Sequence, residues 1–299
     1  MTGMELSIEE IRRGLEAEYP ELDLSVVRPL ATGFGSIALE TPERIVFRIP
    51  RWQGPANGQD AEVRALPFLA GRLPAPIPEP RWRIEQGHPV FRLGAIGYRR
   101  LAGEAPVPGQ INVDALAADL ATFFDALHRV PVADAEEAGI STWLPALEGF
   151  EWQRDAVLPP LRELLDPAEY RAVSRWWDAL LADQTLVTFQ PTVRHGDPWH
   201  GNVLIDPETG RLAGVIDWEG VEIGDPAWDF AAQLYLGEAL FRSVISRCRG
   251  HDSGLEHRAR ALFQVREFGG VRHAAQLGDD AELAGAVTKL RTSSIFAGE

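Results

Sequence analysis

Three polar residues within a short stretch carry the clearest chemical signal in the sequence: Asp197, Asn202 and Asp217. An acid can orient a hydroxyl group and receive its proton, while an amide oxygen and a second carboxylate are hard ligands that suit Mg²⁺. Phosphoryl transfer needs an acceptor hydroxyl held in line, with a metal and positive groups on the phosphates. We therefore predict that Asp197 is catalytic and that Asn202 and Asp217 hold magnesium in a kinase-like phosphotransferase acting on a small molecule.

The same stretch allows a metal-dependent hydrolase as an alternative. His195, Asp197 and His200 have the spacing H-x-D-x-x-H, and imidazole and carboxylate groups are common metal ligands. This alternative leaves Asn202 and Asp217 unexplained, so we favour phosphoryl transfer and interpret His195 as a residue that positions the loop. A nucleotide-binding protein without turnover is a further alternative, but it is expected to lose one of the two aspartates, and both are present.

The elements around these residues must bring them together. The apolar runs VLID and LAGVID flank a PETG turn, a pattern that predicts a β-hairpin and places Asn202 beside Asp217. Asp225 and Pro226 predict the start of a helix that continues through Tyr235, with Asp225 bracing the catalytic loop. Asp229, one turn further on, is interpreted as a second structural acid.

The rest of the chain predicts an α+β fold with two lobes. Residues 1–98 form a small sheet-rich lobe, residues 98–101 its exit, and residues 102–299 a mainly helical lobe. In the first lobe we expect a helix after a capping box at Ser7 and Glu10, and a second helix kinked or split by Pro67. We expect strands on both sides of the TGFGS turn, within residues 24–50, and two further strands at 82–85 and 90–93. The second helix of the first lobe is expected at 60–72. In the second lobe we expect helices at 113–128, after Asp166, at 255–277 and at 279–290.

Composition excludes several classes of protein. The net charge of −15 is opposite to that of a typical nucleic-acid-binding protein, and it could steer a cationic substrate towards a cleft. There is no long apolar run typical of a membrane span, the acidic N-terminus is unlike a signal peptide, and Cys248 is the only cysteine, so we expect a cytoplasmic protein. The chain has a single lysine, Lys289, and no G-x-x-x-x-G-K-[ST] motif, which excludes a P-loop enzyme.

The motifs HGDPWHGNVLID and GVIDWEGVEIGDPAWD resemble the catalytic signature of the aminoglycoside and macrolide phosphotransferase family, whose fold is similar to that of protein kinases. The resemblance covers most of the chain, since IVFRIPR is similar to the strand that carries the phosphate-contacting base and GYRRLAGE to the hinge. It implies that Asp197 is the catalytic aspartate and that Asn202 and Asp217 are the magnesium ligands. Among the subfamilies, FRIPR and ALHRVPVADAEEAGI look most similar to macrolide 2′-phosphotransferases.

The resemblance also implies a nucleotide site. Arg48 takes the place of the strand lysine of protein kinases, with Glu62 as its partner in the following helix and Arg51 as an alternative phosphate contact. Arginine keeps the charge but differs from lysine in reach and geometry. The glycine turn and the hinge complete this predicted site, with purine bound through hinge backbone and GTP favoured over ATP; their residues are Gly33, Gly35, Ser36, Tyr98, Arg99 and Leu101.

The acceptor substrate is predicted from the apolar character of the helical half. A macrolide carries one amine on a large apolar ring, whereas an aminoglycoside needs a site lined with several carboxylates. Aromatic stretches such as STWLPALEGFEW and RWWDALL favour a macrolide, with Glu219 or Glu222 meeting its amine and one of three tryptophans lining an apolar wall: Trp199, Trp218 or Trp228. Aminoglycosides and metabolic alcohols are the alternatives.

Overall fold

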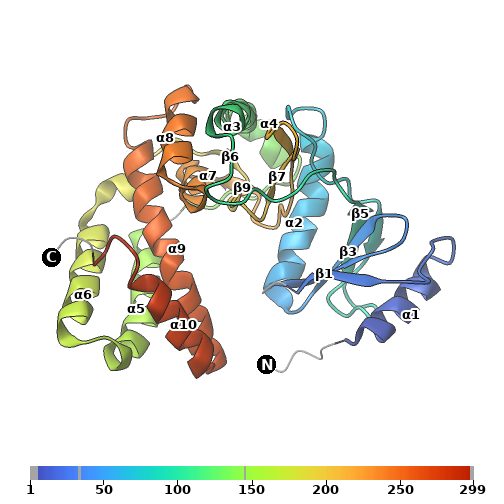
Figure 1. Cartoon of the computed structure of the whole chain (residues 1–299), viewed down its shortest axis with the longest axis horizontal. Coiled ribbons are helices and arrows are strands. Elements are labelled where there is room, and N and C mark those ends of the chain that lie inside the picture. Colours follow the sequence, from blue (N-terminus) through green and yellow to red (C-terminus); the bar gives the residue numbers. More distant parts are fainter. Residues whose placement is uncertain (1–5, 33–34, 145, 297–299) are drawn as a thin grey trace.

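The computed structural model of the protein describes residues 6–32, 35–144 and 146–296. Figure 1 shows two lobes that meet along one side, with a sheet and helices α1 (Ile8–Glu18) and α2 (Gln53–Leu69) in one lobe and mainly helices in the other. The predicted α+β fold, with a small antiparallel sheet and a larger helical lobe, is confirmed.

The first lobe is built on one antiparallel sheet with the strand order β1-β2-β3-β5-β4. Its strands are β1 (Arg28–Thr32), β2 (Ser36–Glu40), β3 (Ile45–Pro50), β4 (Trp82–Ile84) and β5 (Ala95–Arg99). The central strand β3 is buried along its whole length because both faces of the sheet are covered. Phe47 packs in the cluster that includes Ile11 and Leu15 of α1 (Ile8–Glu18), whereas Val46 packs against Val63 on the other face. Since side chains alternate along a strand, Arg48 shares the face of Val46.

One predicted strand, at residues 90–93, is wrong. The chain turns there, because the His88 ring nitrogen accepts hydrogen bonds from the backbone N–H groups of Val90 and Phe91 at 3.2 and 3.0 Å. Phe91 is buried against Gly14 of α1, where a Cβ atom would lie 2.7 Å from the phenylalanine ring. The apolar residues that suggested a strand therefore fill the core from a turn, and the strand itself is β5, which follows.

The second helix of this lobe also differs from the prediction. Helix α2 (Gln53–Leu69) begins seven residues before the expected position 60, and Pro67 lies inside it without dividing it. The helix ends two residues after Pro67, so the proline disturbs only its last turn. Gly54, Pro55 and Gly58 concealed the start of α2, because all three lower intrinsic helix propensity.

The second lobe is mainly helical. Its helices are α3 (Val113–His128), α4 (Val132–Glu137), α5 (Leu147–Leu164), α6 (Pro167–Ala182), α7 (Ala227–Ala231), α8 (Glu238–Arg247), α9 (Leu255–Leu277) and α10 (Asp280–Leu290), with 3-10 helices η1 (Gln184–Val187) and η2 (Ala232–Leu236). The predicted helices at 113–128 and 255–277 are confirmed residue for residue. The capping boxes at Ser7 and Asp166 are also present. The helix expected from Asp225 through Tyr235 is instead α7 followed by η2.

Two small sheets in this lobe carry the polar motif. Strands β6 (Thr192–Arg194) and β9 (Glu222–Gly224) pair with each other, and β7 (Val203–Ile205) and β8 (Leu212–Val215) form the predicted hairpin. These sheets rest on the large apolar core of the lobe, whose aromatic members include Phe123, Phe124, Trp177, Trp218 and Phe230. The loops that follow β6 and β8 are therefore held by rigid supports.

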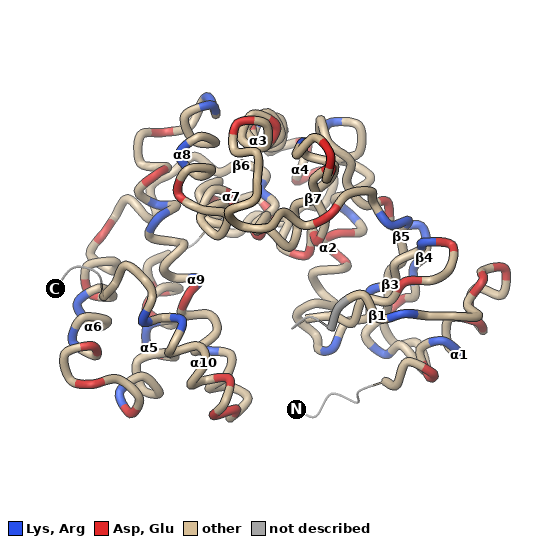
Figure 2. The backbone as a smooth tube through the Cα atoms, viewed as in Figure 1, with Lys and Arg blue, Asp and Glu red and all other residues tan. Residues whose placement is uncertain are grey.

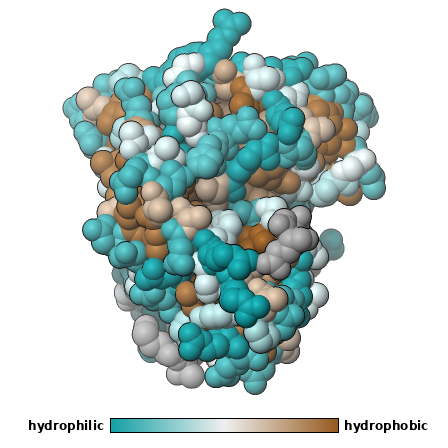
Figure 3. Space-filling view, turned by 90° about the vertical axis from the view of Figure 1, so that its left-hand side faces the viewer, coloured by the Kyte–Doolittle hydropathy of each residue, from teal (hydrophilic) through white to brown (hydrophobic). Residues whose placement is uncertain are grey.

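The surface carries charges of both signs. Figure 2 shows acidic and basic residues scattered over both lobes rather than one basic face. Figure 3, which looks onto the helical lobe, shows apolar residues broken up by hydrophilic ones. Within the described parts of the chain, no helix is long and apolar enough to cross a membrane.

Candidate active site

Asp197 lies in a tight loop that begins where β6 ends. Gly196 has a φ of +88°, and a Cβ atom there would lie 2.6 Å from the carbonyl oxygen of Gly220. Only glycine combines this backbone conformation with so close an approach. The loop of Asp197 is thereby packed against the loop that follows Asp217.

One buried carboxylate anchors the loop that carries Asp197. Asp229 of α7 accepts hydrogen bonds from the backbone N–H groups of His195 and Gly196 at 3.1 and 2.7 Å, and from Nε2 of His128 at 2.9 Å. Burial alone would raise the pKa of Asp229, but the hydrogen bond and charge of His128 outweigh it and lower the pKa. Asp229 therefore stays ionised and holds the loop, a role that sequence analysis gave first to Asp225. Asp225 instead pairs with Arg258 at 2.9 Å inside the core.

His195 links the loop of Asp197 to the backbone just before Asp217 by hydrogen bonds. Its Nε2 donates to the carbonyl oxygen of Ile216 at 3.0 Å, and its Nδ1 accepts from the N–H of Asp197 at 3.2 Å. Burial lowers the pKa of His195, which favours this neutral form. Both ring nitrogens are engaged, so the arrangement speaks against a hydrolase that uses His195 as a metal ligand. His200 stacks on Trp199, with ring centroids 4.4 Å apart.

The hairpin brings the two predicted magnesium ligands together. The β7–β8 pairing continues past the strands, since the N–H of Ile216 donates to the carbonyl oxygen of Asn202 at 2.9 Å. The side-chain nitrogen of Asn202 donates to the carbonyl oxygen of Asp197 at 2.9 Å, which leaves its amide oxygen for a metal. Asp217 has a φ of +66°, a left-handed conformation that a side-chain-bearing residue seldom adopts and that often marks functional sites. An amide oxygen and a carboxylate on adjacent backbone fit the donor set that Mg²⁺ prefers.

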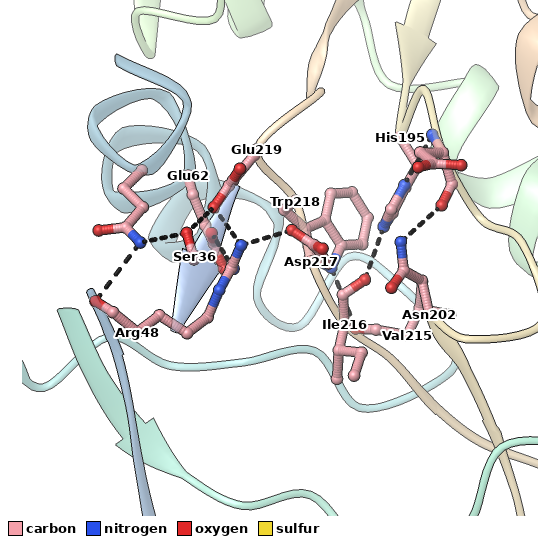
Figure 4. A network of polar contacts seen from close by, with 12 residues as sticks. Ser36, Arg48, Glu62, His195, Asn202, Val215, Ile216, Asp217, Trp218 and Glu219 are labelled. Carbon is pink, nitrogen blue, oxygen red and sulfur yellow. Dashed lines mark hydrogen bonds and ion pairs between the residues drawn. The ribbon is translucent and has the colours of Figure 1, made fainter. Parts of the chain in front are cut away.

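A single buried arginine gathers three carboxylates opposite this hairpin. Arg48 binds Glu62 of α2 at 2.7 Å and Asp217 at 2.6 Å, and it also pairs with Glu219 (Figure 4). The hydroxyl of Ser36 donates to Glu219 at 3.2 Å. The structure thus brings together the predicted pair, Arg48 and Glu62. It also places Glu219 beside Arg48, although sequence analysis gave Glu219 no part in the predicted nucleotide site.

Three carboxylates around one guanidinium group leave the cluster with excess negative charge. Burial raises the pKa of Glu62 to about 7, although Arg48 opposes the shift. Burial likewise raises the pKa of Glu219. One oxygen of Glu62 is buried with no hydrogen-bond partner among the described residues. The cluster is therefore ready to accept positive charge, as a magnesium ion would supply.

Asp197 has a partner that sequence analysis missed. Arg266 of α9 forms an ion pair with its carboxylate across 69 residues of sequence. Partial burial raises the pKa of Asp197, and Arg266 counteracts part of that rise. Nothing in the local sequence around position 266 marks it, because the contact depends on how α9 crosses the lobe.

These groups open onto one cleft of about 980 Å³ between the lobes. Among its lining residues are the predicted ones Gly35, Ser36, Arg48, Tyr98, Leu101, Asp197, Asn202 and Asp217. Glu62 lies behind Arg48, Arg99 is exposed and does not line this cleft, and Gly33 lies outside the described residues. Of the three tryptophans, Trp199 lines the cleft whereas Trp218 is fully buried in the core. Glu222, proposed to meet an amine, pairs instead with Arg194.

Comparison with known proteins supports the resemblance seen in the motifs. Residues 26–263 match the model of the phosphotransferase enzyme family, APH. Viomycin phosphotransferase of Streptomyces vinaceus is 29% identical over 251 residues, which cover 81% of this chain and 85% of that protein. Two solved structures share the fold. The GDP and kanamycin complex of an APH(2″) enzyme has a TM-score of 0.83 at 22% identity and covers 95% of this chain and 97% of its own. Macrolide 2′-phosphotransferase of Brachybacterium faecium has a TM-score of 0.68 at 22% identity and covers 94% and 97%. The chain therefore belongs to the phosphotransferase enzyme family.

Proposed function

We propose that this phosphotransferase transfers the γ-phosphoryl group of a nucleoside triphosphate to a hydroxyl group of an antibiotic. The observation that carries the proposal is that one cleft is lined by Asp197, Asn202 and Asp217 of the helical lobe and by Arg48 of the sheet, which is bonded to Asp217 at 2.6 Å. A basic side chain on the sheet and a catalytic acid on the helical lobe are the parts that phosphoryl transfer requires on either side of the phosphates.

Each residue has a distinct role in this proposal. Asp197 orients the acceptor hydroxyl and receives its proton, a task for which its raised pKa suits it. Asn202 and Asp217 hold Mg²⁺, which neutralises charge on the phosphate oxygens. Arg48 contacts the phosphates while Glu62 keeps it in place, and Arg51 at the end of β3 is the second candidate for this contact.

The nucleotide lies between the lobes. We assign the phosphates to the backbone around Gly33 and Ser36 and the purine to the backbone of the hinge, whose residues are Tyr98, Arg99 and Leu101. The lobe of residues 1–98 then supplies most of the nucleotide contacts, and residues 102–299 supply the catalytic loop and the acceptor site. GTP is the favoured donor, in keeping with the resemblance to macrolide enzymes, and ATP is the alternative.

A macrolide, phosphorylated on the 2′-hydroxyl of its amino sugar, is the first candidate for the acceptor. The described residues that line the cleft include the apolar side chains Trp199 and Leu204, and their one acid besides Asp197 and Asp217 is Glu219, which is already paired with Arg48. Such surroundings suit a large apolar molecule with one amine better than a polycation that needs several free carboxylates.

A polycationic antibiotic is the second candidate, and one specific observation favours it. The relative from Streptomyces vinaceus, at 29% identity over most of both chains, is named for viomycin.

We expect the enzyme to act in the cytoplasm, which agrees with its lone cysteine.

Mass spectrometry tests the proposal directly. Erythromycin, kanamycin and viomycin are each incubated with the protein, Mg²⁺ and either GTP or ATP, and the Asp197→Asn variant serves as control. A gain of one phosphoryl group on erythromycin with GTP alone supports the macrolide and donor assignments together. Transfer to kanamycin or viomycin alone contradicts the macrolide assignment, and no transfer to any of the three contradicts the antibiotic assignment.

A further inference from the structure

Arg266 is the only side chain bonded to the Asp197 carboxylate within the described parts of the chain. Its Nη2 binds Oδ1 of Asp197, and its Nη1 lies 3.5 Å from the carbonyl oxygen of Gly196. The Arg266 side chain is 18% exposed, whereas that of Asp197 is 46% exposed and faces the cleft. The guanidinium group therefore approaches from inside the lobe and leaves part of the carboxylate open to an acceptor.

A second layer of residues holds Arg266 in this position. Its guanidinium carbon lies 5.6 Å from the ring centroid of Tyr235, and Nζ of Lys289 lies 5.1 Å from the same centroid. The Tyr235 hydroxyl donates to Glu267 at 2.6 Å, and Lys289 pairs with Glu267 at 3.1 Å. Two cations and one acid thus surround one ring, which limits the directions in which Arg266 can move.

The contact with Arg266 fixes the orientation of the Asp197 carboxylate. An arginine that binds one carboxylate oxygen restricts rotation of the group, so that the other oxygen keeps a defined direction. Phosphoryl transfer depends strongly on such alignment, because the acceptor oxygen must lie in line with the phosphorus atom.

We propose that Arg266 is a positioning residue, which aligns the Asp197 carboxylate for the acceptor hydroxyl. This inference rests on the proposed function, since it assigns a task to Arg266 only if Asp197 is the group that meets the acceptor. Arg266 itself is not among the residues that line the cleft. Its contribution falls on kcat, through Asp197, rather than on nucleotide affinity.

Arg266→Ala, Arg266→Lys and Arg272→Ala are the variants that test this role. Arg272 is the matched control because it lies on the same helix and also rests over an aromatic ring, that of Trp152 at 5.4 Å, away from Asp197. We expect Arg266→Ala to lower kcat by about 100-fold with little change in the Kd for the magnesium nucleotide. Arg266→Lys should recover part of kcat because it restores the charge without the planar, two-donor geometry.

Rescue by guanidinium ion separates positioning from a purely structural role. The added ion can take the place of the missing side chain beside the Asp197 carboxylate, so it should restore part of the kcat of Arg266→Ala and leave Arg272→Ala unchanged. An Arg266→Ala enzyme that guanidinium ion does not rescue, or one with the same kcat as Arg272→Ala, would overturn the inference.

Failure of the proposed function can be distinguished from failure of the role assigned to Arg266. In that case the unaltered protein transfers phosphate to no acceptor, and crystal structures of Arg266→Ala and Arg272→Ala compare the Asp197 side chain. A rotated Asp197 carboxylate in Arg266→Ala alone shows that Arg266 fixes this group. The same orientation in both variants overturns the inference without any assay of activity.

Discussion

At the scale of single residues, the site depends on a few charged side chains, each with its own set of partners. Arg48 pairs with three carboxylates, Asp229 accepts hydrogen bonds from two backbone N–H groups and a histidine, and Arg266 forms the ion pair with Asp197. Each of these sets of contacts depends on one charged side chain. Single substitutions should therefore separate the steps of binding and chemistry.

The two aspartates should fail in different ways. Asp197→Asn is expected to lower kcat by about 10²- to 10⁴-fold, the usual contribution of a general base, while nucleotide affinity stays nearly intact. Asp217→Asn should instead weaken nucleotide binding in the presence of Mg²⁺ and should not weaken metal-free binding, because the Asp217 carboxylate competes with the phosphates for Arg48. Isothermal titration calorimetry with and without Mg²⁺, beside steady-state kinetics, measures both. Mild and equal effects from the two variants would contradict their assigned roles.

Arg48 should matter for stability as well as for phosphate binding. Arg48→Met leaves Glu62 buried without its partner, and breaking a buried ion pair in this way costs about 3–5 kcal/mol in the free energy of unfolding. The double variant Arg48→Met with Glu62→Met removes both charges and should recover much of that loss. Urea denaturation measures the difference, and a double variant no more stable than Arg48→Met would show that the pair is not the source.

At the scale of elements, the cleft depends on backbones that approach closely. A Cβ atom on Gly58 of α2 would lie 2.8 Å from the Cβ of Glu219 and 3.0 Å from its carbonyl oxygen. Helix α2 can therefore lie directly against the loop that carries Asp217. The residue that lowers the helix propensity of this segment is also the one that permits this contact.

Gly58→Ala should damage the site although it favours a helix. In an open helix the change from glycine to alanine stabilises by about 1 kcal/mol, and Gly285 of α10, with no atom within 4 Å of an added Cβ, is the matched control. We expect Gly285→Ala to keep its activity and gain stability. Gly58→Ala should displace the Asp217–Glu219 loop and raise KM for the nucleotide, as measured by steady-state kinetics. Equal KM values in the two variants would show that the close approach has no functional weight.

What the sequence predicts at this scale depends on how local the cause is. The β7–β8 hairpin and helix α3 follow from turn residues and apolar spacing within a few positions, and both were predicted correctly. The start of α2 and the turn at residues 90–93 were predicted wrongly, because glycine and proline conceal the helix and because Phe91 fills the core from a turn that His88 stabilises. Arg266 and the pairing of Glu219 with Arg48 were not predicted, because the partners lie in other elements. The functions assigned to the site residues remain predictions.

At the scale of the whole molecule, one cluster ties the two lobes together. Ser36 and Arg48 belong to the sheet lobe, whereas Asp217 and Glu219 belong to the helical lobe. The same guanidinium group that is proposed to bind phosphate thus holds the lobes against each other. Binding of the phosphates and contact between the lobes therefore both depend on the positive charge of Arg48.

Glu219 should therefore compete with the nucleotide for Arg48. Glu219→Gln can still accept a hydrogen bond from Ser36 but no longer holds Arg48 by charge. We expect tighter binding of nucleotide in the absence of Mg²⁺, by about 1 kcal/mol or roughly fivefold in Kd, as measured by calorimetry with a chelator present. Glu222→Gln, another half-buried acid with its own arginine, is the control. Unchanged or weaker binding by Glu219→Gln would contradict this competition.

The arginine at position 48 also bears on how inhibitors can capture this enzyme. Electrophilic nucleotide analogues that acylate or sulfonylate an amine require a lysine beside the phosphates, and the only lysine of this chain is Lys289, on α10 of the other lobe. A guanidinium group remains protonated and is a poor nucleophile. Such reagents should modify kinases that carry the strand lysine and leave this nucleotide cleft unmodified, so a covalent inhibitor for it needs a different reactive residue as its target.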